Sequence, residues 1–381
     1  MNLIKNALRF GYRRFPSRLR YGLDLSYLAI SDTIKNMAMP AYLVSGHIRT
    51  STGESSKASF IYLGALPQHK VWCAGIFIDS SSPEPIGRLS LLDIMMRRRG
   101  LATADLVLSP INPLSKALLA KYGWLVVPKY VTCTIDLTRP IEQLIDRAIV
   151  RDVERVQRRM NFRIDTLRED AAFDEFYDDM LVPTVRKRHE ENAFLSSRED
   201  LREVFRRGYL RAAYQGDQWI AAELVVQGTA KSLRTANIGW RGGSEEILKS
   251  RVVSVLMHDL IVWAKKEGFE ELDSGSTYPF VNNGILDFKI KWGARPGLPP
   301  IGSRNGEPIG HDSYLGAYFN TSSAAGRSIL QNFPVFEKRN NEMCIAGWGS
   351  TPSPEATRHL DRGMAWHDLS LPLHGSEPRN A

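Results

Sequence analysis

About twenty residues near residue 280 are the part of this chain that indicates its fold most clearly. It reads Asp273-Ser-Gly-Ser-Thr-Tyr-Pro-Phe-Val-Asn-Asn-Gly284, and after two further residues continues as Asp287-Phe-Lys-Ile-Lys-Trp-Gly-Ala294. A strand pattern fits residues 271–274 and a helical pattern fits residues 281–291. A strand, a polar turn and a short helix in this order indicate an α/β fold.

The segments before this stretch extend the same pattern. The sequence predicts helices at residues 173–190 and 198–207, and strands at residues 210–214, 219–227 and 232–240. A long helix fits residues 249–267, because Val252, Val253, Leu256, Leu260 and Trp263 recur at helical spacing and Gly268 can end it. Residues 163–319 therefore form one α/β half.

An earlier part of the chain, residues 1–140, shows a similar order of elements. Strands are expected at residues 41–48, 59–63 and 71–78, a helix at 89–99, a strand at 104–109, a helix at 113–122 and a strand at 124–135. The similarity lies in the order of elements, not in the residues. The predicted class is α/β, with two halves in tandem and mixed sheets flanked by helices.

Between the two halves, residues 141–162 form the clearest helix of the chain. Its apolar stripe consists of Ile145, Ile149, Val153, Val156 and Met160. Arginines crowd the remaining surface, and Arg151, Arg155 and Arg158 would supply positive potential to an anionic donor or acceptor. The alternative is a solvated basic face on a connecting helix.

Both ends of the chain differ from the halves. Residues 1–23 contain six basic residues and no acid, so a short helix there either lies on an anionic membrane surface or packs on its domain with a solvated basic face. Residues 320–381 are rich in Ser, Gly, Pro and Asn with few periodic segments, and we expect them to be largely irregular and dispensable for chemistry.

The stretch from Asp273 to Ala294 resembles the "D-x-G-x-S…NxG…FKxxWG" region of FemAB-like transferases of the GNAT superfamily, whose relatives act in peptidoglycan, exopolysaccharide and cellulose biosynthesis. The arginine-rich helix is similar to the segment that precedes the second half of these transferases. The segment from Pro183 to His189 is similar to the segment that follows. The resemblance covers roughly residues 130–300. It implies two GNAT-like halves and transfer of an acyl or aminoacyl group from acyl-CoA or aminoacyl-tRNA to an amine.

The resemblance also implies a set of site residues. Lys289, directly after the aromatic Phe288, would lie near the reaction centre, with Lys291 facing solvent and Trp292 packed beneath the helix. Asp273 and His189 complete the catalytic candidates, His189 because its side chain titrates near neutrality. Substrate- or cofactor-binding candidates, together with the three arginines above, are Lys249, Ser250, Ser276, Tyr278 and Asn283.

Two segments of the chain have features of the pyrophosphate-binding loop of GNAT enzymes. The run Arg97-Arg-Arg-Gly-Leu-Ala102 matches R-x-x-G-x-A, but it ends a predicted helix, whereas free amides converge at a helix start. The segment from Arg241 to Ser250 lies between a strand and a helix and contains Gly242 and Gly243. It is the better candidate for an anion site.

Composition limits the remaining possibilities. The chain has 381 residues and a formal net charge of +8, which favours contact with polyanions without selecting one. Cys73, Cys133 and Cys344 form no metal-ligand pattern, and neither a spanning apolar run nor a signal peptide is evident, so we expect a cytoplasmic protein without a metal.

Three functions follow as hypotheses. The first is an acyl- or aminoacyl-transferase acting on a cell-envelope or polysaccharide precursor, with possible peripheral contact with the inner membrane. The second is an inactive GNAT-like scaffold that binds a nucleotide sugar, a lipid-linked precursor or a partner enzyme. The third, an RNA-binding module, is disfavoured because the basic residues are not interleaved with aromatics, and tRNA is a less favoured partner for the same reason.

Overall fold

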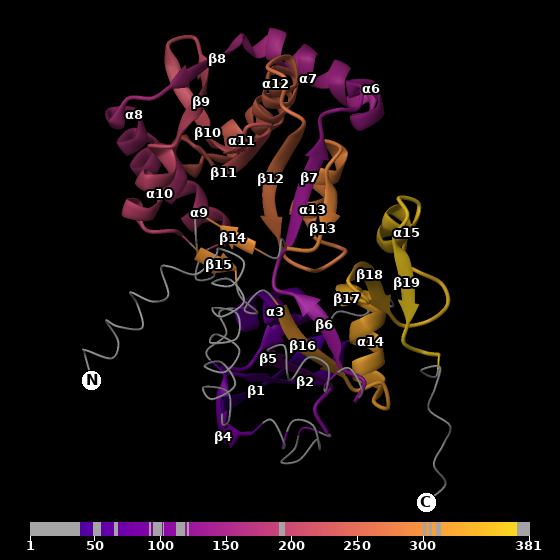
Figure 1. Ribbon diagram of the computed structural model, residues 1–381. Coiled ribbons are helices and arrows are strands. Elements are labelled where there is room, and N and C mark those ends of the chain that lie inside the picture. The colour runs from indigo at the N-terminus through magenta and orange to yellow at the C-terminus, as the bar shows by residue number, and fades with distance from the viewer. Residues whose placement is uncertain are drawn as a thin grey trace, which may run out of the picture. The chain divides into compact units, whose positions relative to one another are not determined.

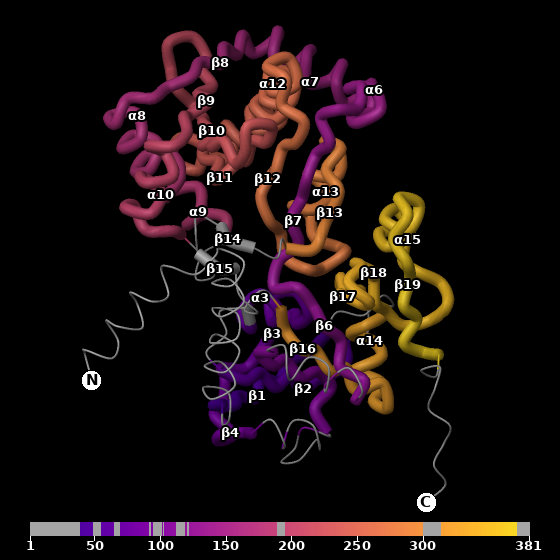
Figure 2. Tube along the Cα trace, in the orientation of Figure 1, coloured from indigo at the N-terminus to yellow at the C-terminus, as the bar shows by residue number. Residues whose placement is uncertain are grey.

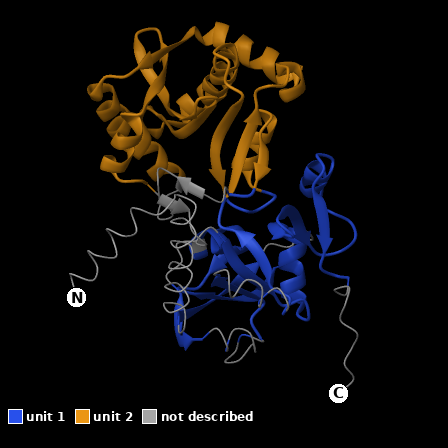
Figure 3. Cartoon of the chain, in the orientation of Figure 1, with its two compact units in different colours: residues 1–130, 278–282, 298–381 blue, residues 131–277, 283–297 orange. Residues whose placement is uncertain are grey.

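A computed structural model describes residues 39–48, 55–64, 68–90, 93, 101, 103–111, 119, 122–189, 195–299, 302–304, 307–309 and 314–371, with only the backbone given for residues 68, 189, 302–304 and 307–309. The basic segment 1–23 and most of the Arg97 to Ala102 loop lie outside the described residues. The chain forms two compact units (Figure 3). Unit 1 contains residues 1–130, 278–282 and 298–381, and unit 2 contains residues 131–277 and 283–297.

Unit 1 is built on a mixed seven-stranded sheet in the order β3-β1-β2-β5-β16-β6, with β4 also paired to β1. Its elements are β1 (Met39–Ile48), β2 (Ser56–Leu63), α3 (Gln68–Ile76), β3 (Phe77–Ser80), β4 (Glu84–Leu89), β5 (Leu106–Pro110), β6 (Leu125–Pro128), β14 (Gly302–Arg304), β15 (Glu307–Ile309), β16 (Tyr314–Phe319), α14 (Ala324–Asn332), β17 (Val335–Arg339), β18 (Glu342–Gly347), α15 (Pro354–Leu360) and β19 (Ala365–Asp368).

A late strand completes this sheet. β16 lies between β5 and β6 and runs antiparallel to both, so a segment two hundred residues further along the chain joins the first-half strands. Figure 2 shows this orange strand among indigo and magenta ones. Unit 1 is therefore discontinuous in sequence, and the predicted boundary at residue 140 does not separate the two units.

The prediction of a largely irregular tail was wrong. Residues 320–371 contain α14, the sheet β17-β18-β19 and α15. Val335, Phe336, Ile345 and Ala346 are fully buried, and α14 contributes Ile329 and Leu330 to the core of unit 1. Low periodicity in sequence concealed these elements because each is short and gains its stability from packing rather than from local propensity.

Two other expectations for unit 1 were also wrong. Residues 68–76 form helix α3 rather than a strand, because Trp72, Cys73 and Ile76 all turn toward one core, as helical but not alternating spacing allows. The run at residues 124–135 is not one strand but two, β6 in unit 1 and β7 in unit 2.

Unit 2 is a second mixed seven-stranded sheet, in the order β13-β7-β12-β11-β10-β9-β8 (Figure 1). Its elements are β7 (Val131–Asp136), α6 (Ile141–Leu144), α7 (Arg147–Met160), β8 (Phe162–Leu167), α8 (Asp170–Glu175), the π-helix η1 (Phe176–Leu181), α9 (Val182–His189), α10 (Arg198–Phe205), β9 (Gly208–Gln215), β10 (Gln218–Thr229), β11 (Ser232–Trp240), the 3₁₀ turn η3 (Arg241–Gly243), α11 (Glu245–Lys249), α12 (Val252–Lys266), β12 (Glu271–Thr277), α13 (Gly284–Lys291) and β13 (Arg295–Gly297).

Helices cover the sheet of unit 2. Phe173, Phe176 and Leu201 of α8, η1 and α10 pack against Leu210 of β9 and Leu224 of β10. The long helix α12 packs against α7, and eight of its residues are buried. With two α/β units, each with a mixed seven-stranded sheet, the structure confirms the predicted class with two halves, although the two units are interleaved in sequence and do not coincide with residues 1–140 and 163–319.

Candidate functional site

The two central strands of unit 2 run parallel but pair over only three residues. Ser232, Leu233 and Arg234 of β11 are opposite Glu271, Leu272 and Asp273 of β12, and pairing ends there. Both strands continue, because β11 remains paired with β10 as far as Trp240, and β12 remains paired with β7 as far as Thr277. The facing edges beyond Arg234 and Asp273 are therefore not paired with each other, which leaves backbone groups that need other partners.

Irregularities in both strands occur where the pairing ends. β11 contains one extra residue, since Val225 is opposite Thr235 whereas Leu224 is opposite Asn237. β12 has an extra residue relative to β7 between Asp273 and Ser276, and Gly275 there has φ +82°, a conformation in which a side chain would be strained. A bulge in each strand explains why the strands diverge at this level.

Lys289 and Asp273 hold the β12 bulge in place. The Lys289 ammonium donates to the Gly275 carbonyl at 2.9 Å and to the Ser276 carbonyl at 3.1 Å. Asp273 Oδ1 accepts the Gly275 N–H at 2.9 Å, and Asp273 Oδ2 lies 3.7 Å from Arg234 Nε. Lys289 is 8% exposed, and burial lowers its pKa. Two of the three predicted catalytic side chains thus contact the strand irregularity.

Lys291 and Trp292 have the exposure that was predicted for them. Lys291 is exposed, and Trp292 is buried at the end of α13. Lys289 and Lys291 therefore point in different directions, as two positions two residues apart on a helix must.

Two buried hydroxyl groups lie where β11 and β12 are no longer paired with each other. Thr235 is 8% exposed and Thr277 is 4% exposed, and neither Oγ1 has a hydrogen-bond partner among the described residues. A buried hydroxyl without a partner costs free energy. These two side chains were not predicted, because a threonine in a strand pattern gives no signal of its own.

The start of α12 carries the predicted anion-binding segment. Lys249 is exposed at the end of α11, whereas the Ser250 hydroxyl donates to the Ile247 carbonyl at 2.6 Å. The next residue, Arg251, has φ +69° and precedes α12, and Ser254 and Val255 donate their N–H groups to its carbonyl. The N–H groups of Val252 and Val253 have no acceptor inside the helix, and the helix dipole adds positive potential at this end.

An ion pair connects this helix start to α7. Arg251 pairs with Asp152, which also binds Arg155 Nη2 at 2.5 Å. These hydrogen bonds lower the pKa of Asp152, with that from Arg155 the larger cause. Neither the left-handed conformation of Arg251 nor its contact with Asp152, about a hundred residues away, is predictable from the local sequence.

The three predicted arginines of α7 lie together on one surface. Asp146 caps this helix by accepting the Ala148 N–H, while Val153 and Val156 face the interior. A surface depression of about 350 Å³ runs along the helix, and its lining residues are Ala148, Arg151, Asp152, Glu154, Arg155 and Arg158.

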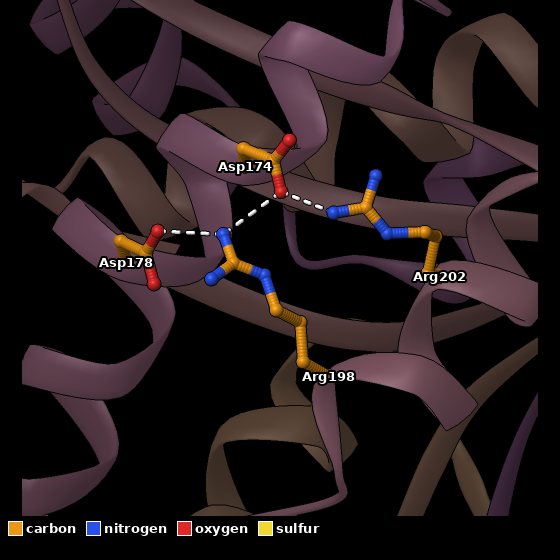
Figure 4. A network of polar contacts seen from close by, with 4 residues as sticks. All are labelled: Asp174, Asp178, Arg198 and Arg202. Carbon is orange, nitrogen blue, oxygen red and sulfur yellow. Dashed lines mark hydrogen bonds and ion pairs between the residues drawn. The ribbon is translucent and has the colours of Figure 1, made fainter.

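A network of ion pairs fixes the helices on the other face of the sheet (Figure 4). Arg198 contacts Asp174 at 2.8 Å and Asp178 at 2.6 Å, and Arg202 also pairs with Asp174. Beyond this group, Arg241 pairs with Glu175 and Asp179 and donates from Nε to the Trp219 carbonyl. Arg241 is thus occupied by structural contacts, which removes it from the anion-binding segment.

The remaining predicted residues do not gather at the strand divergence. Asn283 caps α13 by accepting the N–H groups of Ile285 and Leu286. Ser276 is exposed next to Gly275. Tyr278 belongs to unit 1, where its ring lies 5.5 Å from that of Tyr130 and burial raises its pKa. His189 ends α9, and its side chain lies outside the described residues.

A buried carboxyl group between the sheet and α12 was also not predicted. Glu223 is fully buried opposite Arg211, and neither carboxylate oxygen has a hydrogen-bond partner among the described residues. Burial raises its pKa to about 8 against the opposing effect of Arg211. Arg211 itself pairs with Asp259 of α12.

Comparisons with known proteins gave structural matches alone. No family model and no curated protein matches the chain. L-PGS from Bacillus licheniformis is similar with a TM-score of 0.37 and 12% identity, over 76% of this chain and 88% of that one. FemX is similar with a TM-score of 0.34 and 11% identity, over 77% and 92%.

A tandem GNAT protein from the clavulanic acid biosynthesis pathway is also similar, with a TM-score of 0.29 and 10% identity, over 72% of this chain and 82% of that one. TM-scores this low do not identify a shared site, so a function has to rest on the residues of this chain. Among the described residues, no helix is both long and apolar enough to cross a membrane.

Proposed function

We propose that unit 2 is an acyl- or aminoacyl-transferase that moves an acyl group from acyl-CoA, or from an aminoacyl-tRNA, to an amine of a cell-envelope or polysaccharide precursor. The observation that carries this proposal is the unpaired divergence of β11 and β12 between two bulges. An extended donor with amide groups would pair with these edges as an added strand does. A compact ligand would leave most of the backbone groups without partners.

The chemistry requires positioning more than a nucleophilic side chain. The amine nitrogen attacks the carbonyl carbon of the thioester or ester, the oxygen becomes negative, and the C–S or C–O bond then breaks as the amine proton passes to the leaving group. A backbone N–H at the β11 bulge, near Ala236, would stabilise the oxyanion, and the hydroxyls of Thr235 and Thr277 are further donors.

The charged end of the donor has a candidate place at the start of α12. The free amides of Val252 and Val253, the exposed Lys249 and the guanidinium of Arg251 lie within one short segment. Helix starts of this kind bind phosphate groups. Asp152 would keep Arg251 oriented toward this segment.

The test is two incubations of the purified chain with a panel of amine-bearing envelope precursors, one with acetyl-CoA and one with an aminoacyl-tRNA. Mass spectrometry detects acylated or aminoacylated product, and a thiol reagent detects free CoA. The double variant Thr235→Val, Thr277→Val keeps the volume of both side chains and removes the two hydroxyls. We expect it to lower kcat/KM by about tenfold or more. The control is Thr229→Val, at the exposed end of β10.

Two results would contradict the proposal. One is a chain that binds neither CoA nor precursor and releases no thiol. The other is binding of precursor without any transfer from either donor class, which would favour the scaffold alternative.

A further inference from the structure

The outer side of α7 carries a line of arginines. The proposed transfer reaction assigns no role to them. Arg147, Arg151, Arg155 and Arg158 recur at i, i+4, i+8 and i+11, which places them within one stripe about 17 Å long. All four are exposed. In Figure 1, α7 lies at the outer rim of unit 2, with α12 on its inner side.

Most arginines of this stripe have no ion pair with a carboxylate in the described part of the chain. Arg155 pairs with Asp152, and Arg151 donates to a backbone carbonyl of its own helix. Arg147, Arg158 and Arg159 have no carboxylate partner in the described part of the chain. By contrast, Arg198 and Arg202 of the same unit both pair with Asp174. Clustered cations without counter-ions repel one another, so the stripe favours an anionic partner.

The length of the stripe distinguishes between partners. A single pyrophosphate spans only two neighbouring guanidinium groups, whereas four arginines over about 17 Å fit an array of phosphates. The depression lined by Arg151, Arg155 and Arg158 has a volume of about 350 Å³, enough for a single headgroup, and its lining also includes Ala148 and the carboxylates of Asp152 and Glu154. α7 contains no aromatic residue on which a nucleobase could stack. Its apolar residues Val153 and Val156 face the interior, so the helix would not insert into a hydrocarbon layer.

From these observations we infer that the arginine stripe of α7 (Arg147, Arg151, Arg155 and Arg158) docks the protein on the phosphate headgroups of an anionic phospholipid surface. Binding is electrostatic and reversible, because the contact is made by exposed guanidinium groups and not by buried apolar area. Arg251, linked through Asp152, connects the docking face to the start of α12. The lipid contact itself does not depend on the proposed transfer reaction.

Vesicle flotation tests this inference. The full chain is mixed with vesicles of phosphatidylcholine containing about one third phosphatidylserine, and with pure phosphatidylcholine vesicles, over a salt range of about 0.05 to 0.5 M. We expect binding to the anionic vesicles alone, with a steep loss as salt rises. The triple variant Arg151→Gln, Arg155→Gln, Arg158→Gln should lower the partition coefficient by about 100-fold.

A charge-matched control removes three exposed cations elsewhere in unit 2, as Arg206→Gln, Arg207→Gln, Lys231→Gln. It should lower binding by less than about threefold. The variant with three Lys in place of Arg151, Arg155 and Arg158 retains the charge and should retain most of the binding.

Three outcomes would overturn the inference: equal loss in the triple variant and its control, equal binding to neutral vesicles, or binding of a structured RNA that depends on the three arginines while vesicle binding does not. Because no acyl donor is present, a failure here leaves the transfer assay unaffected. Likewise, an inactive enzyme would still be expected to bind the vesicles.

Discussion

At the scale of single residues, Lys289 has a role that its motif does not specify. Its ammonium binds two backbone carbonyls at the β12 bulge in a buried position, so it stabilises the irregular strand. The resemblance to FemAB-like transferases places it near the reaction centre, and both roles would make it sensitive to substitution. Stability measurements separate them.

Lys289→Met should lower the free energy of unfolding by about 2–3 kcal/mol, because the Gly275 and Ser276 carbonyls lose charged donors in a buried place. Urea denaturation measures this change. Lys291→Met is the matched control, and the exposure of Lys291 predicts a change below about 0.5 kcal/mol. If the two variants are equally stable, Lys289 does not support the bulge, and any loss of transfer would then report a direct role.

Glu223 makes stability depend on pH in the opposite sense to a paired carboxylate. Its folded pKa, about 8, lies above the usual value of 4.5, so the folded state holds a proton that the unfolded chain releases. A rise in pH from about 4.5 to about 8 therefore lowers the free energy of unfolding, because the unfolded chain is deprotonated while the folded state keeps its proton. Below about pH 4.5 and above about pH 8 the contribution of Glu223 does not change with pH.

Glu223→Gln should remove this loss of unfolding free energy at higher pH. The difference in unfolding free energy between variant and wild type should therefore shift in favour of the variant by about 1.4 kcal/mol per pH unit between about pH 5 and 8. Denaturant titrations across that range measure it. Glu246→Gln is the control, because a hydrogen bond from Ser244 lowers the pKa of Glu246 and its effect is complete below pH 5. A constant difference across the range would mean that Glu223 is ionised in the folded protein.

At the scale of elements, the three-stranded sheet β17-β18-β19 shows how a segment without periodicity becomes part of a core. Cys344, Ile345 and Ala346 of β18 are buried, and β18 lies between its two partners. Phe280 forms a bridge with Val335 of β17, which ties this sheet to another segment of unit 1.

Truncation tests the contribution of this sheet. A chain ending at Asn341 lacks β18, α15 and β19 and exposes Val335 and Phe336, each worth about 1.5–3 kcal/mol of burial. We expect the truncated protein to lose cooperative melting of unit 1 or to become insoluble, as followed by calorimetry. A chain ending at Leu371 retains every described element and should melt as the wild type does. Normal melting of the shorter chain would show that the sheet is an appendage.

At the scale of the whole molecule, the chain enters each unit more than once. Unit 1 needs residues 314–319 to complete its sheet, because β16 pairs with β5 on one side and β6 on the other. A fragment of residues 1–140 therefore leaves β6 without its pairing partner and should not fold alone, as judged by circular dichroism and proteolysis. Joining residues 298–381 to this fragment by a flexible linker should restore a protected core. A folded fragment 1–140 would mean that β16 is not required.

The secondary structure and the amphipathic faces of this chain could be predicted from the sequence, because they depend on neighbouring residues. The alternation of strands and helices, the amphipathic α7 with its arginines, the long helix α12 and the strand–turn–helix from Asp273 onward are local patterns, readable within windows of ten to twenty residues. Arg151 was a candidate for this reason, whereas Lys289 was a candidate through the resemblance of its stretch to FemAB-like transferases.

Strand order, bulges and contacts between distant residues became visible in the three-dimensional structure alone, because they depend on pairing between distant segments. The place of β16 between β5 and β6, the bulges that separate β11 from β12, and the contact of Arg251 with Asp152 each join segments far apart in the chain. Strand order and register follow from burial and hydrogen bonding summed over the whole sheet, and a sheet partner leaves no mark on its neighbour's local sequence. For the same reason a buried Glu223 and a structural Lys289 cannot be told from ordinary charged residues until the fold surrounds them with low-dielectric protein.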